Sequence, residues 1–288
     1  MKITNKLPIQ FEMTRSDNVW FVINKQYHEV VKYIINNSAR IKVTDYAQGR
    51  GTFRLVKINR QGIKNIVIRH YYRGGLIGAW FLRDLFLDFN RPINELIITE
   101  QARAKGVPVP EILGLVISRV GMVFYRAEII LKEVPQTQNL NEIFSGLMAQ
   151  SVSPETLRLT KLEFNKAIAG SIKLLHQVGI YHRDLNIRNI LIQRTNETGL
   201  NAYIIDFDKS KRFNELHFKK RIHNLIRLNR SIEKWGWSGN VINNSDRIRM
   251  VNEYLKNEKV DRAQKVWLLK QCKRELMLHS HWWKIMGK

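Results

Sequence analysis

Short runs in which apolar and polar residues alternate dominate the first half of the chain. Three of them cover residues 41–48, 53–58 and 65–72, contain many β-branched side chains and are separated by glycine-containing turns. Alternation of this kind indicates β-strands with one buried face. Two further apolar runs, residues 113–118 and 122–130, continue the series. The pattern predicts a β-sheet in the N-terminal part of the chain.

One helix is predicted within this strand-rich region, from Pro92 to Lys105. Asn90 is a suitable N-cap, and Gly106 can end the helix before the rigid Val-Pro-Val-Pro string of residues 107–110. The first 135 residues are therefore expected to form a sheet with a single helix.

Further along the chain the apolar residues recur at the spacing of an α-helix. A long amphipathic run starts at Pro154 and stops at Gly179, and the residues after Phe213 are mostly helical in pattern. Two short apolar strands, at 189–193 and 202–206, lie between these helices. A sheet followed by helices predicts an α+β protein with two lobes.

Length and composition agree with this division. A chain of 288 residues, 44% of them hydrophobic, can form two domains of ordinary size. We assign residues 1–135 to a β-rich N-lobe, 136–240 to an α-helical C-lobe, and 241–288 to a basic, tryptophan-containing helical extension. The single Cys272 excludes an intrachain disulfide, and neither a secretory leader nor a membrane-spanning run is predicted, so a reducing, cytosolic location is expected.

Net charge is the unusual property of this sequence. Its value of +23 at pH 7 calls for a polyanionic partner, and nucleic acid, anionic lipid headgroups and phosphorylated substrates all qualify. A basic surface that merely keeps the protein soluble is the simpler alternative. Charge alone does not choose between these classes.

The most specific motif is Tyr-His-Arg-Asp-Leu-Asn-Ile-Arg-Asn-Ile-Leu-Ile at residues 181–192. It matches the kinase catalytic-loop pattern H-R-D-L-x-x-x-N, and Asp-Phe-Asp at the end of a later strand takes the place of D-F-G. Asp184 is the catalytic candidate, because a carboxylate there can accept or orient the proton of a substrate hydroxyl. Asn189 and Asp206 supply the hard oxygen atoms that suit Mg²⁺ bridging the phosphates of ATP.

Each of these residues has an ordinary structural explanation when taken alone. Asp206 could be a solvated carboxylate at a strand end, and His182 could be a histidine of the core. An aspartate, an asparagine five residues later and a second aspartate after a hairpin form a composite that rarely arises by chance. The combination favours phosphoryl transfer, with ATP and Mg²⁺ as cofactors.

A loop that covers phosphates is expected between two strands of the N-lobe. Gly49, Arg50 and Gly51 occupy that turn, and glycines allow backbone N–H groups to approach phosphate oxygens. Arg54 stands where a third glycine would complete the usual loop, so an ordinary hairpin turn is the alternative.

Arg69 ends the strand that corresponds to the V-A-I-K strand of kinases, which makes it the candidate cation for the α- and β-phosphates. Its expected partner is Glu95 on the following helix, with Glu100 as the competitor. A guanidinium can bind phosphates through two parallel bonds, but it is bulkier than the usual lysine and cannot lose its charge.

Several strings together resemble the lipopolysaccharide core kinases. They are Arg-His-Tyr-Tyr-Arg-Gly-Gly at residues 69–75, Arg-Pro-x-x-Glu at 91–95, the catalytic-loop and Asp-Phe-Asp strings, and Asn-Leu-x-Arg-Leu-x-Arg-Ser at 224–231. The resemblance covers about residues 20–234 and is greater to 3-deoxy-D-manno-octulosonic acid (Kdo) kinases than to heptose kinases.

This resemblance implies a protein-kinase-like fold that uses ATP and Mg²⁺ to phosphorylate a hydroxyl of Kdo on a lipid A precursor, at the cytoplasmic side of the bacterial inner membrane. It also implies that an arginine at position 69, paired with Glu95, is ordinary for the family. Two alternatives stay open. One is another kinase of the same fold, such as a heptose, small-molecule or atypical Ser/Thr kinase, and the other is a basic nucleic-acid-binding protein on a vestigial kinase fold.

The C-terminal part of the sequence bears on the nature of the acceptor. Only 82 residues follow Asp206 and they contain no A-P-E string, so the peptide-docking platform of protein kinases is expected to be absent or reduced. A small or lipid-linked hydroxyl is the favoured acceptor. The candidates for binding its anionic groups, chosen by charge and by position in the sequence, are Arg73, Lys209, Lys211 and Arg212.

Contact with an anionic membrane surface is expected from the same region. From residue 209 onward, 20 Lys and Arg residues stand against 7 Asp and Glu. Tryptophans accompany this charge at positions Trp235, Trp237, Trp267, Trp282 and Trp283. Basic and indole side chains together suit the boundary between headgroups and acyl chains, and internal packing of the indoles is the alternative.

Overall fold

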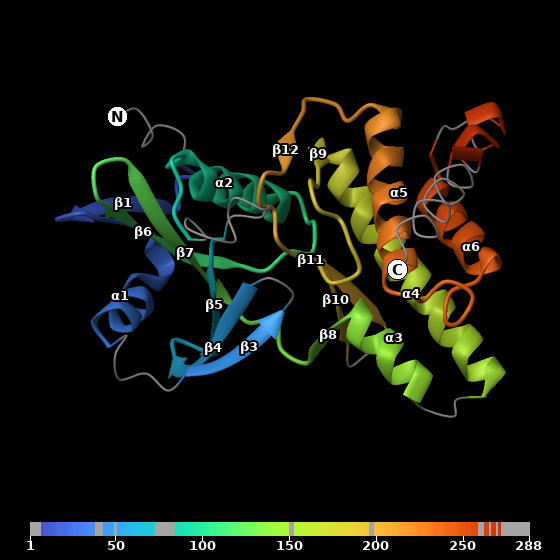
Figure 1. The fold of residues 1–288 in the computed structure, drawn as a ribbon, viewed down its shortest axis with the longest axis horizontal. Coiled ribbons are helices and arrows are strands. Elements are labelled where there is room, and N and C mark those ends of the chain that lie inside the picture. The colour runs from blue at the N-terminus through green and yellow to red at the C-terminus, as the bar shows by residue number, and fades with distance from the viewer. Residues whose placement is uncertain are drawn as a thin grey trace, which may run out of the picture. The chain divides into compact units, whose positions relative to one another are not determined.

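The computed structural model of the chain describes residues 7–37, 43–48, 51–72, 84–149, 153–195 and 199–258, together with 262–264, 266–268 and 270–271. The chain forms two compact units, whose elements are labelled in Figure 1. The first consists of Met1–Arg103 and Pro110–Val134, and the second of Ala104–Val109 and Pro135–Lys288. A strand-rich first unit and a helix-rich second unit confirm the α+β class.

The first unit is built on one antiparallel sheet of seven strands, in the order β1-β2-β6-β7-β5-β4-β3. The strands are β1 (Phe11–Ser16), β2 (Val19–Asn24), β3 (Val43–Gln48), β4 (Gly51–Arg60), β5 (Ile63–His70), β6 (Ile112–Val120) and β7 (Phe124–Lys132). The three alternating runs become the neighbours β3, β4 and β5, and the two later apolar runs become the hairpin β6–β7. The hairpin β1–β2, which was not expected, pairs with β6.

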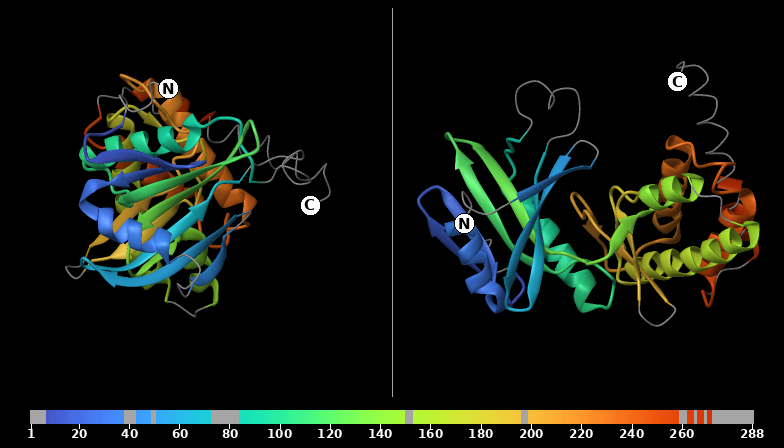
Figure 2. Two further views of the ribbon diagram at one scale, coloured as in Figure 1. Left: turned by 90° about the vertical axis from the view of Figure 1, so that its left-hand side faces the viewer. Right: turned by 90° about the horizontal axis from the view of Figure 1, so that it is seen from below.

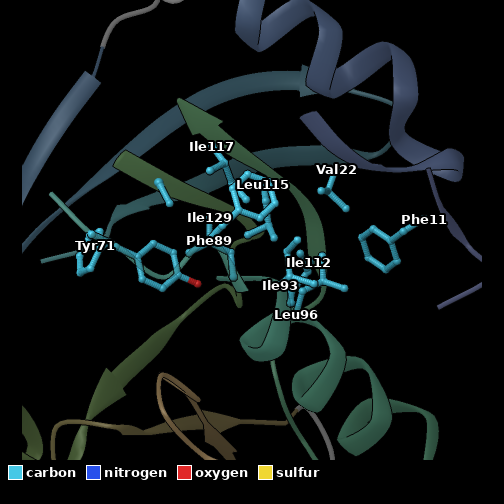
Figure 3. Close-up of a cluster of buried hydrophobic side chains, with 12 residues drawn as sticks. Phe11, Val22, Tyr71, Phe89, Ile93, Leu96, Ile112, Leu115, Ile117 and Ile129 are labelled. Atoms are coloured by element: carbon cyan, nitrogen blue, oxygen red, sulfur yellow. The ribbon is translucent and has the colours of Figure 1, made fainter. Parts of the chain in front are cut away.

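One face of this sheet packs against helix α2 (Asn90–Ala104). Val22, Leu115 and Ile129, from three strands, form a cluster with Ile93 and Leu96 of the helix, and all five side chains are buried (Figure 3). Burial of an aliphatic side chain of this size contributes about 1.5–3 kcal/mol. The helix predicted over residues 92–105 is confirmed, and this packing fixes its position against the sheet.

The opposite face packs against a second helix, α1 (His28–Asn36), which follows the 3-10 turn η2 (Lys25–Tyr27). Ile23 and Ile130 of the sheet form a cluster with Val30, Val31 and Ile34 of this helix. Successive strand residues point to opposite faces, so a sheet that is apolar on both faces needs a cover on each. The expectation of a single helix in the first 135 residues is therefore wrong, as the views of α1 beside the sheet in Figure 2 illustrate.

The second unit is mainly helical. Its elements are β8 (Thr137–Asn139), α3 (Leu140–Ala149), α4 (Pro154–Gln177), β9 (Ile180–Tyr181), β10 (Ile190–Arg194), β11 (Leu200–Ile204), β12 (Lys211–Arg212), α5 (Phe218–Lys234) and α6 (Asn244–Leu255). The strands form two small sheets, β11-β10-β8 and β12-β9. The predicted long helix and strand pair correspond to α4, β10 and β11, so these predictions are confirmed.

Helix α4 leads into the short strand that precedes the catalytic-loop motif. Its first turn is capped by Ser153, whose Oγ accepts the N–H of Thr156 at 3.2 Å. The helix stops before Gly179, which has a φ of +79°. A Cβ atom at this position would lie 2.1 Å from the carbonyl oxygen of Phe213, so only glycine is compatible with the turn.

Helix α6 packs on α4 and brings part of the expected C-terminal extension into the second unit. Asn243 and Asp246 form a capping box at its N-terminus, and Asp246 also accepts a bond from the ammonium group of Lys161 at 3.1 Å. Tyr254 and Leu255, near its C-terminal end, are buried. Within the described part of the chain, no helix is both long enough and apolar enough to cross a membrane.

The tryptophans of the C-terminal region differ in their surroundings. Trp237 donates its Nε1–H to Oδ1 of Asn141 at 2.9 Å, which matches the alternative of internal packing. Trp235 and Trp267 are both partly exposed. Trp282 and Trp283 lie outside the described residues.

Candidate active site

The catalytic-loop motif occupies residues 182–189, between β9 and β10. His182 is fully buried; its Nε2–H donates to the carbonyl oxygen of Ile205 at 3.0 Å, and its Nδ1 accepts the backbone N–H of Asp184 at 3.2 Å. These two bonds require a neutral ring, and burial correspondingly lowers the pKa of His182. His182 is a core histidine that joins the loop to the segment carrying Asp206.

Asp184 projects from a loop whose backbone is fixed by its neighbours. The carbonyl oxygen of Asp184 accepts Nδ2–H bonds from Asn186 at 3.0 Å and from Asn189 at 2.9 Å. The carboxylate, by contrast, is 62% exposed and lies 4.0 Å from the guanidinium of Arg227. A carboxylate that is open to solvent on a rigid loop can meet a substrate hydroxyl and accept its proton.

Asn189 and Asp206 are brought close by a backbone bond, in which Ile205 N–H donates to the Asn189 carbonyl oxygen at 3.0 Å. Asp206 has a φ of +65°, a left-handed conformation that Asp and Asn tolerate better than most residues. Nδ2 of Asn189 is bonded to the loop, and Oδ1, the acceptor atom of the amide, is the atom of this side chain that can bind a cation.

These two oxygen donors fit Mg²⁺. This ion is usually bound by one or two protein carboxylates, and waters and substrate phosphates complete its coordination. The described residues contain no group of three or more histidine, cysteine or carboxylate side chains that could hold a metal. The carboxylate of Asp206 and the amide oxygen of Asn189 are oxygen donors of the kind that suit a phosphate-bridging magnesium ion.

Helix α5 anchors both ends of the catalytic loop. Oδ1 of the fully buried Asn224 accepts the backbone N–H of His182 at 3.0 Å, and its Nδ2 donates to the His182 carbonyl at 2.8 Å. Seven residues later, Ser231 accepts the backbone N–H of Ile187 at 3.1 Å. The string at 224–231 carried no predicted role, although two polar residues at i and i+7 on one helix face were a usable signal.

A buried polar chain extends from Asn224 to helix α6. His176 of α4 donates its Nε2–H to Oδ1 of Asn224 at 3.1 Å, and its Nδ1 accepts the hydroxyl of Tyr254 at 2.7 Å. Burial lowers the pKa of His176 to about 3 and raises that of Tyr254 to about 12, so both groups are neutral at physiological pH. The loop anchor therefore depends on the mutual packing of α4, α5 and α6.

In the first unit, the ion pair expected between β5 and α2 is present. Nη2 of Arg69 lies 2.5 Å from Oε1 of Glu95, whose Oε2 accepts the hydroxyl of Tyr71 at 2.6 Å. Glu95 is only 4% exposed, whereas Arg69 is 24% exposed. The competitor Glu100 bonds to other side chains instead. Glu95 thus orients a guanidinium that remains accessible.

The expected phosphate-covering loop is described in part. Gly51 begins β4, whereas Gly49 and Arg50 lie outside the described residues. Arg54, at the position of the missing third glycine, forms an ion pair with Glu128 of β7. The side chain of Arg54 therefore joins β4 to β7 within the sheet.

Three of the cations suggested for the acceptor lie near the catalytic loop. Lys211 and Arg212 are exposed on β12, which pairs with β9 at the start of the loop. Lys209 is exposed as well, and Arg73 lies outside the described residues. Because Lys209, Lys211 and Arg212 are exposed and close to the loop, we still propose them for binding the acceptor.

Comparison with known proteins finds relatives that are similar to about two thirds of this chain. The model of the lipopolysaccharide kinase (Kdo/WaaP) family matches residues 37–248. The 3-deoxy-D-manno-octulosonic acid kinase of Vibrio vulnificus is 34% identical over 202 residues, which are 68% of this chain and 75% of that protein. The protein of the same description from Pasteurella multocida is 31% identical over 197 residues, which are 67% of this chain and 76% of its own length.

The fold is similar to that of a solved structure described as WaaP in complex with acyl carrier protein. The TM-score is 0.54 at 15% identity, and the match covers 88% of this chain and 98% of the other. This similarity confirms the kinase-like fold expected from the sequence. The family match over most of the chain and the relative at 34% identity establish that this protein belongs to the Kdo/WaaP family of lipopolysaccharide kinases.

Proposed function

We propose that this kinase transfers the γ-phosphoryl group of ATP to a hydroxyl of Kdo on a lipid A precursor. Its family makes it a phosphotransferase of lipopolysaccharide biosynthesis. The observation that carries the proposal is the exposed carboxylate of Asp184 on a loop anchored by α5. Kdo is the favoured acceptor because the similar proteins of Vibrio vulnificus and Pasteurella multocida are Kdo kinases.

Each candidate residue has a separate task in this reaction. The acceptor O–H bond breaks as its oxygen bonds to the γ-phosphorus, ADP leaves, and Asp184 receives the proton. Mg²⁺, when bound, neutralises charge on the phosphates, and Asn189 and Asp206 would hold it. Arg69, oriented by Glu95, would bind the phosphates of the nucleotide.

A comparison of substrates tests the proposal. The full chain is incubated with labelled ATP and Mg²⁺ in separate reactions with a lipid A precursor carrying Kdo, a heptose-bearing core acceptor, a generic protein and RNA. We expect label on the Kdo-bearing acceptor, with mass spectrometry placing the phosphate on Kdo. Phosphate on heptose or protein in preference to Kdo would overturn the acceptor assignment, and RNA binding without any transfer would favour a vestigial kinase.

Substitution of Arg69 is expected to weaken the use of ATP. Arg69→Lys keeps a charge near the phosphates but loses the bidentate geometry, so the KM for ATP should rise about tenfold. Arg69→Ala loses both and should lower kcat/KM by about 100-fold. Initial rates at varied ATP measure both effects, and Lys57→Ala and Lys64→Ala, at exposed positions of β4 and β5, are the controls. Wild-type kinetics in Arg69→Ala would exclude this role.

Attachment to the membrane surface is a further part of the proposal. Residues 209–288 carry 20 Lys and Arg against 7 Asp and Glu, and each basic residue near an anionic bilayer contributes about 1 kcal/mol. Such attachment would bring the enzyme to a lipid-linked acceptor at the cytoplasmic side of the inner membrane. We expect sedimentation with anionic vesicles that falls steeply from low to high salt, because screening weakens the attraction. Equal sedimentation with neutral vesicles would contradict this expectation.

A further inference from the structure

Helix α5 presents a third side chain to the catalytic loop besides the two anchors. Asn224, Arg227 and Ser231 follow the i, i+3, i+7 spacing that places residues on one helix face. Asn224 and Ser231 bond to backbone groups at the two ends of the loop. Arg227 lies between them along the helix, with its Nη1 4.0 Å from Oδ1 of Asp184.

The guanidinium of Arg227 is positioned beside Asp184 but is not bonded to it. A charge-assisted bond between nitrogen and oxygen measures about 2.7–2.9 Å, well below the observed separation. The side chain of Arg227 is 32% exposed, so part of the group can reach an incoming molecule. Its Nε is buried and has no hydrogen-bond partner within the described part of the chain. A ligand would therefore meet the Nη groups of this guanidinium, one of which already faces Asp184.

We infer that Arg227 binds the carboxylate of the acidic sugar and thereby selects the hydroxyl that reaches Asp184. The inference rests on the proposed function, because it takes Kdo as the acceptor. Kdo is a sugar acid, so a carboxylate lies at a fixed distance from each ring hydroxyl. The five N–H donors of a guanidinium match a carboxylate in a planar, two-point contact, which sets orientation as well as affinity. A cation that holds the carboxylate in this way therefore decides which hydroxyl of the sugar lies beside Asp184.

The competing role for Arg227 is to orient Asp184 without touching the acceptor. Both roles predict that its loss lowers activity, so a simple mutation does not separate them. A chemical change on the acceptor does separate the two roles. Conversion of the Kdo carboxylate to the carboxamide keeps its size and removes the charge that a guanidinium recognises.

The experiment combines both changes. Wild-type protein and Arg227→Gln are each assayed with the carboxylate and the carboxamide forms of the same Kdo-bearing lipid A precursor. We expect either change alone to raise the KM for the acceptor about 10- to 100-fold, the range of a bond to a charged group. The two changes together should cost no more than one, and the KM for ATP should stay constant. Lys219→Gln, which removes a charge from an exposed position of the same helix, is the matched control.

The outcomes separate the inference from the proposed function. Equal use of both acceptors by the wild-type protein overturns the inference alone, and this arm does not depend on the folding of any variant. Losses that multiply when the changes are combined also overturn it, because they assign Arg227 to the positioning of Asp184. Absence of transfer to either acceptor refutes the proposed function, and the inference with it. Arg227→Lys should recover part of the carboxylate preference, since it restores the charge without the two-point geometry.

Discussion

Replacement of Asp184 by alanine is expected to lower phosphoryl transfer by at least about 100-fold, the usual contribution of a general base. In the proposed reaction, the variant loses the group that would orient the acceptor hydroxyl and take its proton. The fold should be unaffected, because the carboxylate is 62% exposed and the loop is anchored through backbone groups. Substitutions at such positions change the free energy of unfolding by about 0.5 kcal/mol or less. Single-turnover rates and thermal unfolding measure the two effects.

Two further variants test whether the loss of activity in Asp184→Ala comes from the missing general base. Asp184→Asn preserves shape but cannot accept the proton, so it should be as inactive as the alanine variant. Glu215→Ala removes an exposed carboxylate elsewhere in the second unit and should leave turnover unchanged. Retention of more than about a tenth of the wild-type rate in Asp184→Ala would be too much for a lost general base and would reject the assignment.

Asp206→Asn is expected to weaken the use of MgATP by about 100-fold in kcat/KM, since a bound metal ion contributes several kcal/mol to charge stabilisation. The substitution removes the negative charge that would face the ion. It is compatible with the backbone, because asparagine also tolerates the left-handed conformation of this residue, with its φ of +65°. The Mg²⁺ concentration at half-maximal activity should rise, and calorimetry should detect weaker binding of MgATP.

Asp208→Asn is the comparison for this variant, because it removes a carboxylate two residues later in the same segment. We expect a smaller effect on MgATP binding than at position 206. An equal loss in both variants would mean that both carboxylates serve the metal. Unchanged MgATP affinity and unchanged turnover in Asp206→Asn would refute its role as a ligand.

Local pattern was sufficient to predict many of the strands and helices. The alternation in residues 41–72 and 113–130 predicted β3 to β7, because the period of side chains along a strand is a property of the backbone alone. Helix α1 was missed. Its apolar residues Val30, Val31 and Ile34 face a sheet surface that exists only after β2, β6, β7, β5 and β4 have paired in that order. The hairpin β1–β2 was missed for the same reason, since its pairing with β6 is remote in sequence.

In the candidate site, too, local features were predictable from the sequence and contacts between remote residues were not. The spacing of Asp184, Asn189 and Asp206 was visible in the sequence, because a loop of defined length and a strand end present these groups locally. The contacts that position these three residues were not visible, because they join residues that are remote in sequence. Asn224 anchors His182 from 42 residues away, and a buried chain through His176 continues to Tyr254.

The sequence by itself determined the fold class of this protein and its order of sheet and helices, and it named the candidate residues for phosphoryl transfer. These properties depend on residue types and on short spacings. The sequence also named Glu95, with Glu100 as competitor, as the partner of Arg69, and the structure confirms that pair. Only the tertiary structure decided that Arg227 lies beside Asp184 and that Asn224 and Ser231 hold the catalytic loop. Pairing of this kind depends on which side chains become buried together, because removal from water makes the choice of hydrogen-bond partner obligatory. Burial is a property of the packed chain, and no short stretch of sequence contains it.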